Sequence, residues 1–153
     1  RMHADMRTHP DAPTLLIAED DSDDRRLIAD AFAAIGVFDA LRFVGDGAAV
    51  LDYLRHRGEF SNRALYPRPR VVILDLNMPR MDGREVLREM RADAALRDLP
   101  VLVLTTSSAV EDEQHVRACG ADGYLVKPVS FGALVSMVTG IQQRWLHLPE
   151  PLS

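Results

Sequence analysis

The sequence is poor in the residues and segments that mark several classes of protein. It holds a single cysteine, Cys119, so no disulfide can form within the chain, which favours a reducing compartment such as the cytoplasm. No apolar run approaches the roughly 20 residues that a membrane-spanning helix needs, and the chain does not open on a secretory signal pattern. The five histidines are scattered without the spacing of metal ligands. These absences argue against a disulfide framework, a membrane protein and a histidine metal centre.

Positive charge is also scarce, and lysine is almost absent. The net charge is −5 and no basic stripe is visible, which argues against a nucleic-acid-binding surface. Of the 18 basic residues only Lys127 is a lysine, and all the others are arginine. A lone lysine in such a chain either arises by chance or marks a position that needs a compact ammonium group. Composition alone leaves both interpretations open.

What the sequence does have is a regular alternation of strand and helix patterns. Short apolar, β-branched runs predict five strands, at 14–18, 40–46, 71–75, 99–105 and 122–126. Segments with helical spacing of apolar residues follow each of them. This alternation predicts an α/β fold, a doubly wound five-stranded parallel sheet with helices on both faces. We expect one domain at 14–148, a loose arm at 1–13 and a tail at 149–153.

Helix ends can be placed from residues with known capping preferences. Gly36 suits the end of the first helix, and the starts of the later helices match side chains that accept hydrogen bonds from the backbone. The predicted caps are Asp46, Asp82 with Glu85, Ser108 with Glu111, and Ser130, whose helix should run to about His147.

Polar and charged residues come at the carboxyl ends of four of the predicted strands. They are Glu19, Asp20 and Asp21 after the first strand, Asp75 and Asn77 after the third, Thr105 and Thr106 after the fourth, and Lys127 after the fifth. In open parallel sheets ligands bind at this edge. Clustered carboxylates repel one another unless a cation joins them, and ligands that are all oxygen suit Mg²⁺. The sequence therefore predicts a magnesium site there.

Asp75 raises a specific question, because four apolar residues of a buried strand run directly into its charge. One interpretation is an Asx-turn before Pro79. The other is a nucleophile toward a phosphoryl group, with Thr105 and Lys127 stabilising the phosphoryl oxygens. We favour the second, because all these groups converge at one edge of the sheet.

Three further acidic residues, Asp21, Asp23 and Asp24, are interpreted differently. They lie at the start of the first predicted helix, beside Ser22. Negative charge in a first helical turn is favoured by the helix dipole. We therefore expect these three side chains to be solvated rather than part of the site.

Four motifs, AEDDSDD, ILDLNMPRMDG, VLTTSS and YLVKPV, resemble the receiver domain of two-component response regulators. The resemblance spans residues 14–145, with the motifs in order. It implies a flavodoxin-like sheet of order 2-1-3-4-5 and a sensor histidine kinase as partner. It also implies that Mg²⁺ is held by Asp20, Asp75 and the main-chain carbonyl of Asn77, with Glu19 acting through a metal-bound water.

The same resemblance assigns roles to residues on the later strands. Asp75 corresponds to the phosphoacceptor, and Thr105 and Lys127 to the hydroxyl and ammonium that contact the phosphoryl group. Tyr124 corresponds to a switch aromatic that turns inward as Thr105 moves, although the residue itself fits a plain half-buried aromatic equally well. A cis peptide bond is implied between Lys127 and Pro128.

A finer resemblance comes from DGAAVLDYL, LTTSS and the aromatic QRWLHL segment. Together these look like the single-domain regulators that serve bacterial and cyanobacterial phytochrome kinases. The implied partner is then a bacteriophytochrome, and we expect no output domain to follow.

The last predicted helix carries apolar residues at heptad spacing, namely Leu134, Val138, Ile141, Trp145 and Leu148. Its first half should pack on the sheet, and its end should reach beyond the sheet. We therefore expect a homodimer formed by this helix and the neighbouring 4-5-5 face, made of the fourth helix, fifth strand and fifth helix. The alternative is a tail that folds back on its own body.

Two rival functions share some of these features. A haloacid-dehalogenase-type phosphatase also uses an Asp nucleophile, a hydroxyl, a lysine and Mg²⁺. Such enzymes have a second Asp as general acid two residues after the nucleophile, where this chain has Asn77. An interaction module that is never phosphorylated is the other rival, and the intact set of Asp20, Asp75, Thr105 and Lys127 argues against it.

Overall fold

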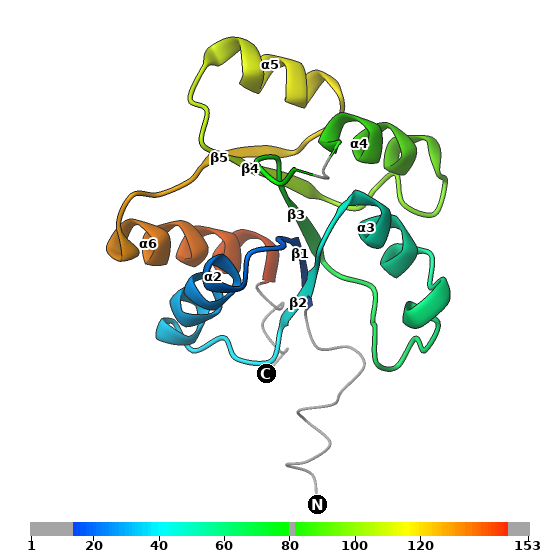
Figure 1. The fold of residues 1–153 in the computed structure, drawn as a ribbon, viewed down its shortest axis with the longest axis horizontal. Helices are drawn as coiled ribbons and strands as arrows, with labels where there is room; N and C mark the ends of the chain where they lie inside the picture. The colour runs from blue at the N-terminus through cyan, green and yellow to red at the C-terminus, as the bar shows by residue number, and fades with distance from the viewer. Residues whose placement is uncertain (1–13, 80–81, 147–153) are drawn as a thin grey trace, which may run out of the picture.

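The computed structural model describes residues 14–79 and 82–146, and these form one five-stranded parallel sheet with helices on both sides (Figure 1). The strands are β1 (Leu15–Ala18), β2 (Leu41–Val44), β3 (Val71–Asp75), β4 (Val101–Thr105) and β5 (Gly123–Val126). Their order is β2-β1-β3-β4-β5, which confirms the predicted topology. No helix within the described ranges is long and apolar enough to cross a membrane.

Five α-helices cover the sheet, and Figure 1 shows α2 and α6 on one side of it and α3 and α4 on the other. They are α2 (Ser22–Ala34), α3 (Gly47–Leu54), α4 (Gly83–Ala92), α5 (Val110–Ala118) and α6 (Phe131–Ile141). A short 3-10 helix (Gly58–Phe60) follows α3, and a π-helical turn (Gln142–Leu146) extends α6. His147, where the last helix was predicted to end, lies outside the described residues.

Alternate residues of the central strands supply two separate cores, because successive strand side chains point to opposite faces. Leu16, Val72 and Leu74 pack with α3 and α4 residues. Leu15 and Ile17 pack on the opposite face with α2 and α6 residues. Covering both faces explains why the strands read as continuous apolar runs.

The register of the strands brings the predicted polar residues to one edge of the sheet. Ala18 pairs with Leu74, so Glu19 follows β1 at the level of Asp75. Asp75 in turn pairs with Leu104, and Thr105 pairs with Val126. The four strand ends therefore meet at the same edge.

Three of the four predicted capping side chains are confirmed. Asp46, Asp82 and Ser130 each accept a hydrogen bond from a backbone amide in the first turn of the following helix. Gly36, at φ +85°, follows the end of α2 as predicted.

The prediction for Ser108 is wrong. The N-cap of α5 is Ala109, which makes no side-chain hydrogen bond. Ser107, which lies before the helix, makes the hydrogen bonds near the helix start instead. Its hydroxyl accepts from the Ala109 amide at 3.2 Å and donates to Asp112 Oδ2 at 2.6 Å.

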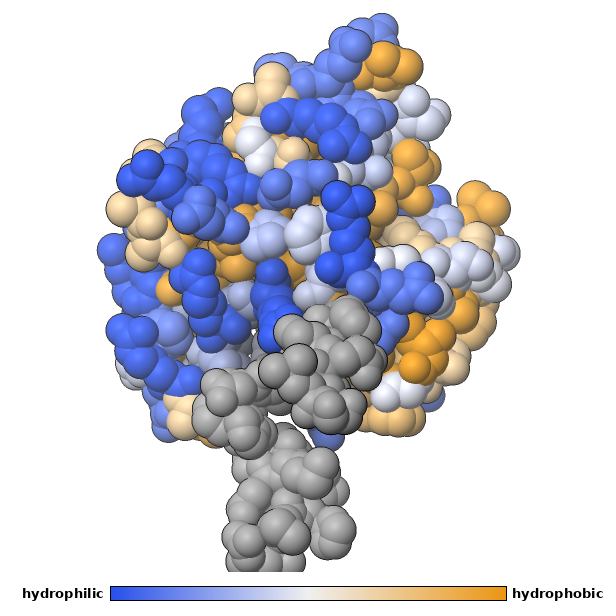
Figure 2. Space-filling model, turned by 180° about the vertical axis from the view of Figure 1, so that it is seen from behind, coloured by the Kyte–Doolittle hydropathy of each residue, from blue (hydrophilic) through white to orange (hydrophobic). Residues whose placement is uncertain are grey.

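Large apolar side chains that stay exposed lie mostly around α2, α5 and α6. Among them are Leu27, Val110, Val126, Val129 and Phe131. Figure 2 shows the apolar patches concentrated on the side of the molecule that carries α5 and α6.

Candidate functional site

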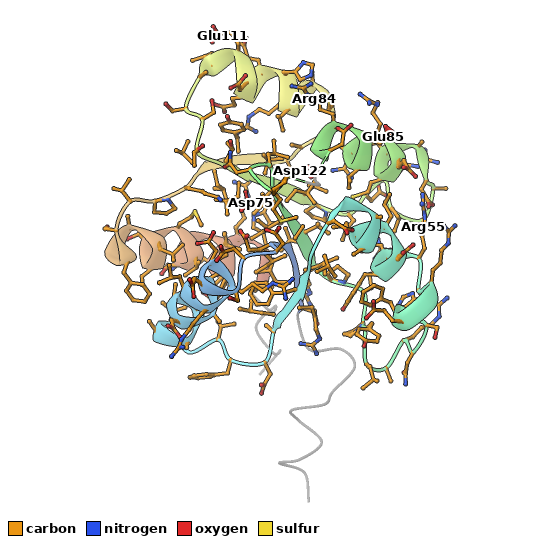
Figure 3. All side chains as sticks on the ribbon, viewed as in Figure 1. Arg55, Asp75, Arg84, Glu85, Glu111 and Asp122 are labelled. Atoms are coloured by element: carbon orange, nitrogen blue, oxygen red, sulfur yellow. The ribbon has the colours of Figure 1, made fainter. Side chains whose placement is uncertain are left out.

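Asp75 ends β3 in a buried position and is paired with a cation. Its side chain lies near the centre of the molecule in Figure 3, whereas Glu111 and Arg55 lie at the periphery. Asp75 is 1% exposed, and its Oδ2 lies 2.7 Å from Lys127 Nζ. Its Oδ1 accepts a hydrogen bond from the Asn77 amide at 2.9 Å. The buried carboxylate is therefore compensated by an ammonium and a backbone donor.

Lys127 is the only lysine of the chain, and the structure places it against Asp75. Burial opposes the charged form of this side chain, but the contact with Asp75 and the charges of Glu19 and Asp24 together outweigh it and raise the lysine pKa. Its backbone amide donates to Thr105 O at 2.7 Å, which continues the β4–β5 pairing. This position favours the functional interpretation of the lone lysine over chance.

The peptide bond between Lys127 and Pro128 is trans, so the implied cis bond is wrong. The trans form is favoured even before proline, by about 0.5–1 kcal/mol. In this conformation Lys127 already reaches both β4 and Asp75.

Glu19 follows β1 and lies beside Asp75 in the same pocket. It is 2% exposed, and Oε2 accepts from the Asp21 amide at 3.1 Å. Burial, and next a side-chain hydrogen bond with Asp75, raise the pKa of Glu19 to about 8, so without a cation the protonated carboxyl can donate to Asp75. When Glu19 is ionised, its buried Oε1 has no hydrogen-bond partner within the described residues. A buried acceptor without a partner is rare in folded proteins, so this oxygen indicates that a ligand belongs in the pocket.

The structure adds Asp24, which the sequence placed in solvent. Asp21 and Asp23 are exposed as expected, but Asp24 is half-buried, so that prediction is wrong for Asp24. Carboxylate oxygens of Glu19, Asp24 and Asp75 all lie within 4.8 Å of one another. The reason is the helix start. Asp21 caps α2 by accepting from the amides of Asp23 and Asp24, and helical side chains lean toward the N-terminus.

Asp20 and Asn77 were both predicted to hold the metal, Asn77 through its main-chain carbonyl. Asp20 is exposed and is not part of the group of three carboxylates. The Asn77 side chain accepts from the Thr106 amide at 2.8 Å, which joins the loop after β3 to the loop after β4.

Thr105 and Tyr124 are connected through Ser107. Thr105 is 6% exposed, and its Oγ1 accepts from the Ser107 amide at 3.2 Å. The Tyr124 hydroxyl donates to the Ser107 carbonyl at 2.8 Å, and its half-buried ring packs on the core. The two residues predicted to form a switch thus hold the same loop residue.

The predicted dimer residues are mostly engaged within the chain. Val138 and Ile141 are buried in the core beneath α6, and Leu134 and Trp145 are partly buried against it. Leu148 lies outside the described residues.

The residues present fit a divalent cation. The donors are oxygen atoms only, which suits a hard ion such as Mg²⁺. Glu19, whose Oε1 is the unpartnered oxygen, is one of the three residues that supply them. Of the three side chains predicted to take part in the metal site, Glu19, Asp20 and Asp75, the structure brings Glu19 and Asp75 together and adds Asp24.

Fold and site together define a class of protein, a doubly wound sheet with a carboxylate and lysine pocket at its carboxyl edge. The chain belongs to the response regulator receiver domain family, a family of signalling domains, whose model matches residues 15–139.

Known relatives agree with this assignment. The probable methanogenesis regulatory protein FilR2 of Methanothrix harundinacea is 40% identical over 133 residues, covering 86% of this chain and 83% of FilR2. Response regulator Rcp1 of Synechocystis sp. is 37% identical over 138 residues, covering 87% of this chain and 88% of Rcp1. The Mn²⁺-bound crystal structure of Rcp1 matches with a TM-score of 0.76, covering 92% of this chain and 99% of that one.

A solved structure from red light signaling is also similar. The response regulator RPA3017 of R. palustris matches with a TM-score of 0.85 at 37% identity, covering 92% of this chain and 99% of RPA3017. The chain is therefore similar to phytochrome-associated response regulators.

Proposed function

We propose that this receiver accepts a phosphoryl group on Asp75 from a phosphohistidine of a sensor histidine kinase, in a Mg²⁺-dependent reaction. The observation that carries the proposal is the contact of Asp75 Oδ2 with Lys127 Nζ at 2.7 Å, beside the unpartnered Glu19 oxygen. A buried carboxylate with a lysine and an acidic pocket is suited to nucleophilic attack on phosphorus.

The reaction can be followed through the residues of this chain. An Asp75 carboxylate oxygen forms a bond to phosphorus while the bond from phosphorus to the kinase imidazole breaks, and the imidazole nitrogen keeps the electron pair. Negative charge then moves from the carboxylate to the phosphoryl oxygens. The Lys127 ammonium and the Thr105 hydroxyl lie at neighbouring strand ends, from which they can follow that charge.

A bound Mg²⁺ would be held by the carboxylates beside Asp75 and would neutralise charge on the phosphoryl oxygens. Attack of water on phosphorus later releases inorganic phosphate and restores the carboxylate. The domain thereby catalyses only its own phosphorylation and dephosphorylation.

Signal output is proposed to run through the loop after β4. If the Thr105 hydroxyl turns to a phosphoryl oxygen, it releases the Ser107 amide that it now accepts from. Ser107 is also the residue that Tyr124 and Asp112 hold. Phosphorylation would then shift the population of loop and Tyr124 conformations toward the one that a partner binds.

The central test is labelling of the protein by acetyl phosphate. Asp75→Asn should abolish labelling, because an amide is a far weaker nucleophile, and EDTA should abolish labelling of the wild type. The matched control is Asp39→Asn, an exposed Asp outside the pocket, which should label normally. Labelled Asp75→Asn protein would contradict the proposal.

The proposed donor kinase is a bacteriophytochrome acting in the cytoplasm. Support comes from the similarity to RPA3017, a response regulator of red light signaling, and to Rcp1. Phosphotransfer profiling against the histidine kinases of the host should show the fastest transfer from a phytochrome kinase. Preferred transfer from a kinase without a light-sensing module would overturn this assignment of the partner.

A homodimer through α6 and the 4-5-5 face (α5, β5 and α6) remains our proposal. Val138 and Ile141 are buried in the core of a single chain, so they are not available to a partner. The interface would use the exposed parts of Leu134 and Trp145. The apolar patches on this side of the molecule support it (Figure 2). Light scattering at micromolar concentration should give twice the chain mass, and a 17.0 kDa species would contradict it.

The phosphatase alternative is less well supported. Asn77 stands where such an enzyme has its general acid, and an amide cannot transfer a proton. Its side-chain oxygen is also engaged by the Thr106 amide. Multiple turnover of p-nitrophenyl phosphate would restore this alternative.

A further inference from the structure

The side chain of Asp24 lies close to Glu19 and Asp75 and has no partner within residues 14–79 and 82–146. It is half-buried in the first turn of α2, and among the described residues no hydrogen bond or ion pair engages its carboxylate. A carboxylate in this position loses water without gaining a donor, which is unfavourable.

The second observation is the neighbouring Glu19 oxygen. Glu19 belongs to the same group of acidic residues and is 2% exposed, and its ionised Oε1 has no partner in the part of the chain that the structure describes. A cation placed between Glu19, Asp24 and Asp75 would satisfy this oxygen and the free Asp24 carboxylate together. No protein donor within the described residues does so.

When the Glu19 carboxyl is ionised, charge in the pocket is unbalanced if only the protein is counted. Lys127 brings one positive charge close to the carboxylates of Glu19, Asp24 and Asp75. Arg25 lies nearby, but its Nε donates to the Glu19 backbone carbonyl and its guanidinium lies 5.4 Å from the centre of the Phe43 ring. A divalent ion is therefore the charge that this pocket lacks.

A small cleft opens beside the group of carboxylates. It has a volume of about 100 Å³, and Glu19, Asp24 and Lys127 line it together with apolar residues such as Leu27, Leu104 and Leu134. A single water needs only ~10–15 Å³ measured in this way, so the volume is sufficient for waters on the side where the charged residues lie. Mg²⁺ in proteins usually keeps several of its waters.

We propose that Asp24 is a third carboxylate of the divalent-cation site, supplied by helix α2 rather than by a strand end. This inference rests on the proposed function, because it assigns a residue to the cation which that function requires. Through Asp24, the cation would also contact the first turn of α2 directly.

The test compares Mg²⁺ affinity by isothermal titration calorimetry, with Mn²⁺ binding followed by electron paramagnetic resonance as an independent readout. Asp24→Asn should weaken binding by about tenfold, the size expected when a group supporting a metal is lost. Asp23→Asn is the matched control, since it removes the same charge from the same helical turn at an exposed position. It should change the dissociation constant by less than about twofold through weak, screened electrostatics.

Equal dissociation constants for Asp24→Asn and Asp23→Asn would overturn the inference. Thermal unfolding in EDTA checks that both variants fold, and Asp24→Asn should melt at or above the wild-type temperature because repulsion is removed. A lower melting temperature would mean that Asp24 serves the apo fold instead, which also overturns the inference.

Failure of this inference can be told apart from failure of the proposed function. If the wild type binds Mg²⁺ and is labelled on Asp75, but Asp24→Asn behaves like its control, only the role of Asp24 is wrong. If the wild type neither binds Mg²⁺ nor accepts a phosphoryl group, the proposed function itself is wrong.

Discussion

At the scale of single residues, the site is governed by how buried charges are compensated. Asp75 is matched by Lys127, whereas Glu19 is left with an unpartnered oxygen. The two carboxyl groups lie together, so the apo protein favours a proton on Glu19. A site that holds a proton in the absence of metal releases it when a cation binds.

This protonation makes the stability of the metal-free protein depend on pH. The pKa of Glu19 is raised from 4.5 to about 8 in the folded protein, so the folded state holds the proton more tightly than the unfolded state. The free energy of unfolding should therefore fall as the pH rises from about 4.5 to 8, at a limit of about 1.4 kcal/mol per pH unit.

Urea denaturation in EDTA at pH 5 and pH 8 measures this effect. In Glu19→Gln the free energy of unfolding should fall much less between pH 5 and pH 8 than in the wild type, because an amide does not titrate. Glu59→Gln, at an exposed position, is the control and should show the wild-type fall. Identical pH dependence in the two variants would contradict this electrostatic explanation.

At the scale of secondary structure, one arginine joins α4 to the loops that precede β4 and β5. The Arg91 guanidinium donates to the carbonyls of Gly120 and Leu99 and to Asp122 Oδ2, at 2.7–3.1 Å. Asp122 in turn accepts from the Val101 amide at 2.8 Å. Gly120 has φ +113°, and a Cβ there would lie 2.8 Å from the Arg91 side chain. This geometry fixes the ends of β4 and β5 that lie opposite the site.

Arg91→Lys should lower the free energy of unfolding by about 2 kcal/mol, because an ammonium cannot satisfy these carbonyls and the carboxylate at once. Arg88→Lys is the control on the same helix, since Arg88 is exposed and its ion pair among the described residues is with Glu85, at 3.9 Å. Urea denaturation of both variants measures the difference. If they differed by less than about 0.5 kcal/mol, the contribution of a partly exposed ion pair, the network would add little to stability.

At the scale of the whole molecule, the site draws on loops after four strands, so ligand binding should stabilise the entire fold. A ligand that binds only the folded state at a hundred times its dissociation constant adds about 2.7 kcal/mol. Mg²⁺ should therefore raise the melting temperature, and NaCl at equal ionic strength should not. Asp75→Asn should reduce the gain. A gain of equal size from both salts would show that screening, not a specific site, is responsible.

Much of this molecule follows from local patterns. The strands and most caps were predictable because apolar periodicity and capping side chains act over a few residues. The edge of the sheet where Glu19, Asp75 and Lys127 meet followed from the parallel arrangement itself. Asp24 was missed because no local pattern tells it from Asp23.

The other wrong or open predictions also depend on contacts that local patterns do not determine. Ser108 is a residue type that often caps helices, but here Ser107 makes the hydrogen bonds near the start of α5, to Asp112 and from the Ala109 amide. Val138 and Ile141 fit a dimer seam as well as a core, and only the packing of α6 on the sheet shows that one chain buries them. The Asn77 side chain accepts a hydrogen bond from the Thr106 amide, and the sequence does not predict this contact between the loops after β3 and β4.

The sequence by itself determined the α/β fold, the order of its elements and the edge of the sheet at which the polar residues gather, because these depend on the period of apolar residues and on the constraints of parallel strands. Only the tertiary structure decided which acidic side chains face the pocket. The direction of a side chain depends on where its helix begins and on what packs around it. Asp23 and Asp24 are chemically identical neighbours, and the start of α2 alone turns one to solvent and the other toward Asp75.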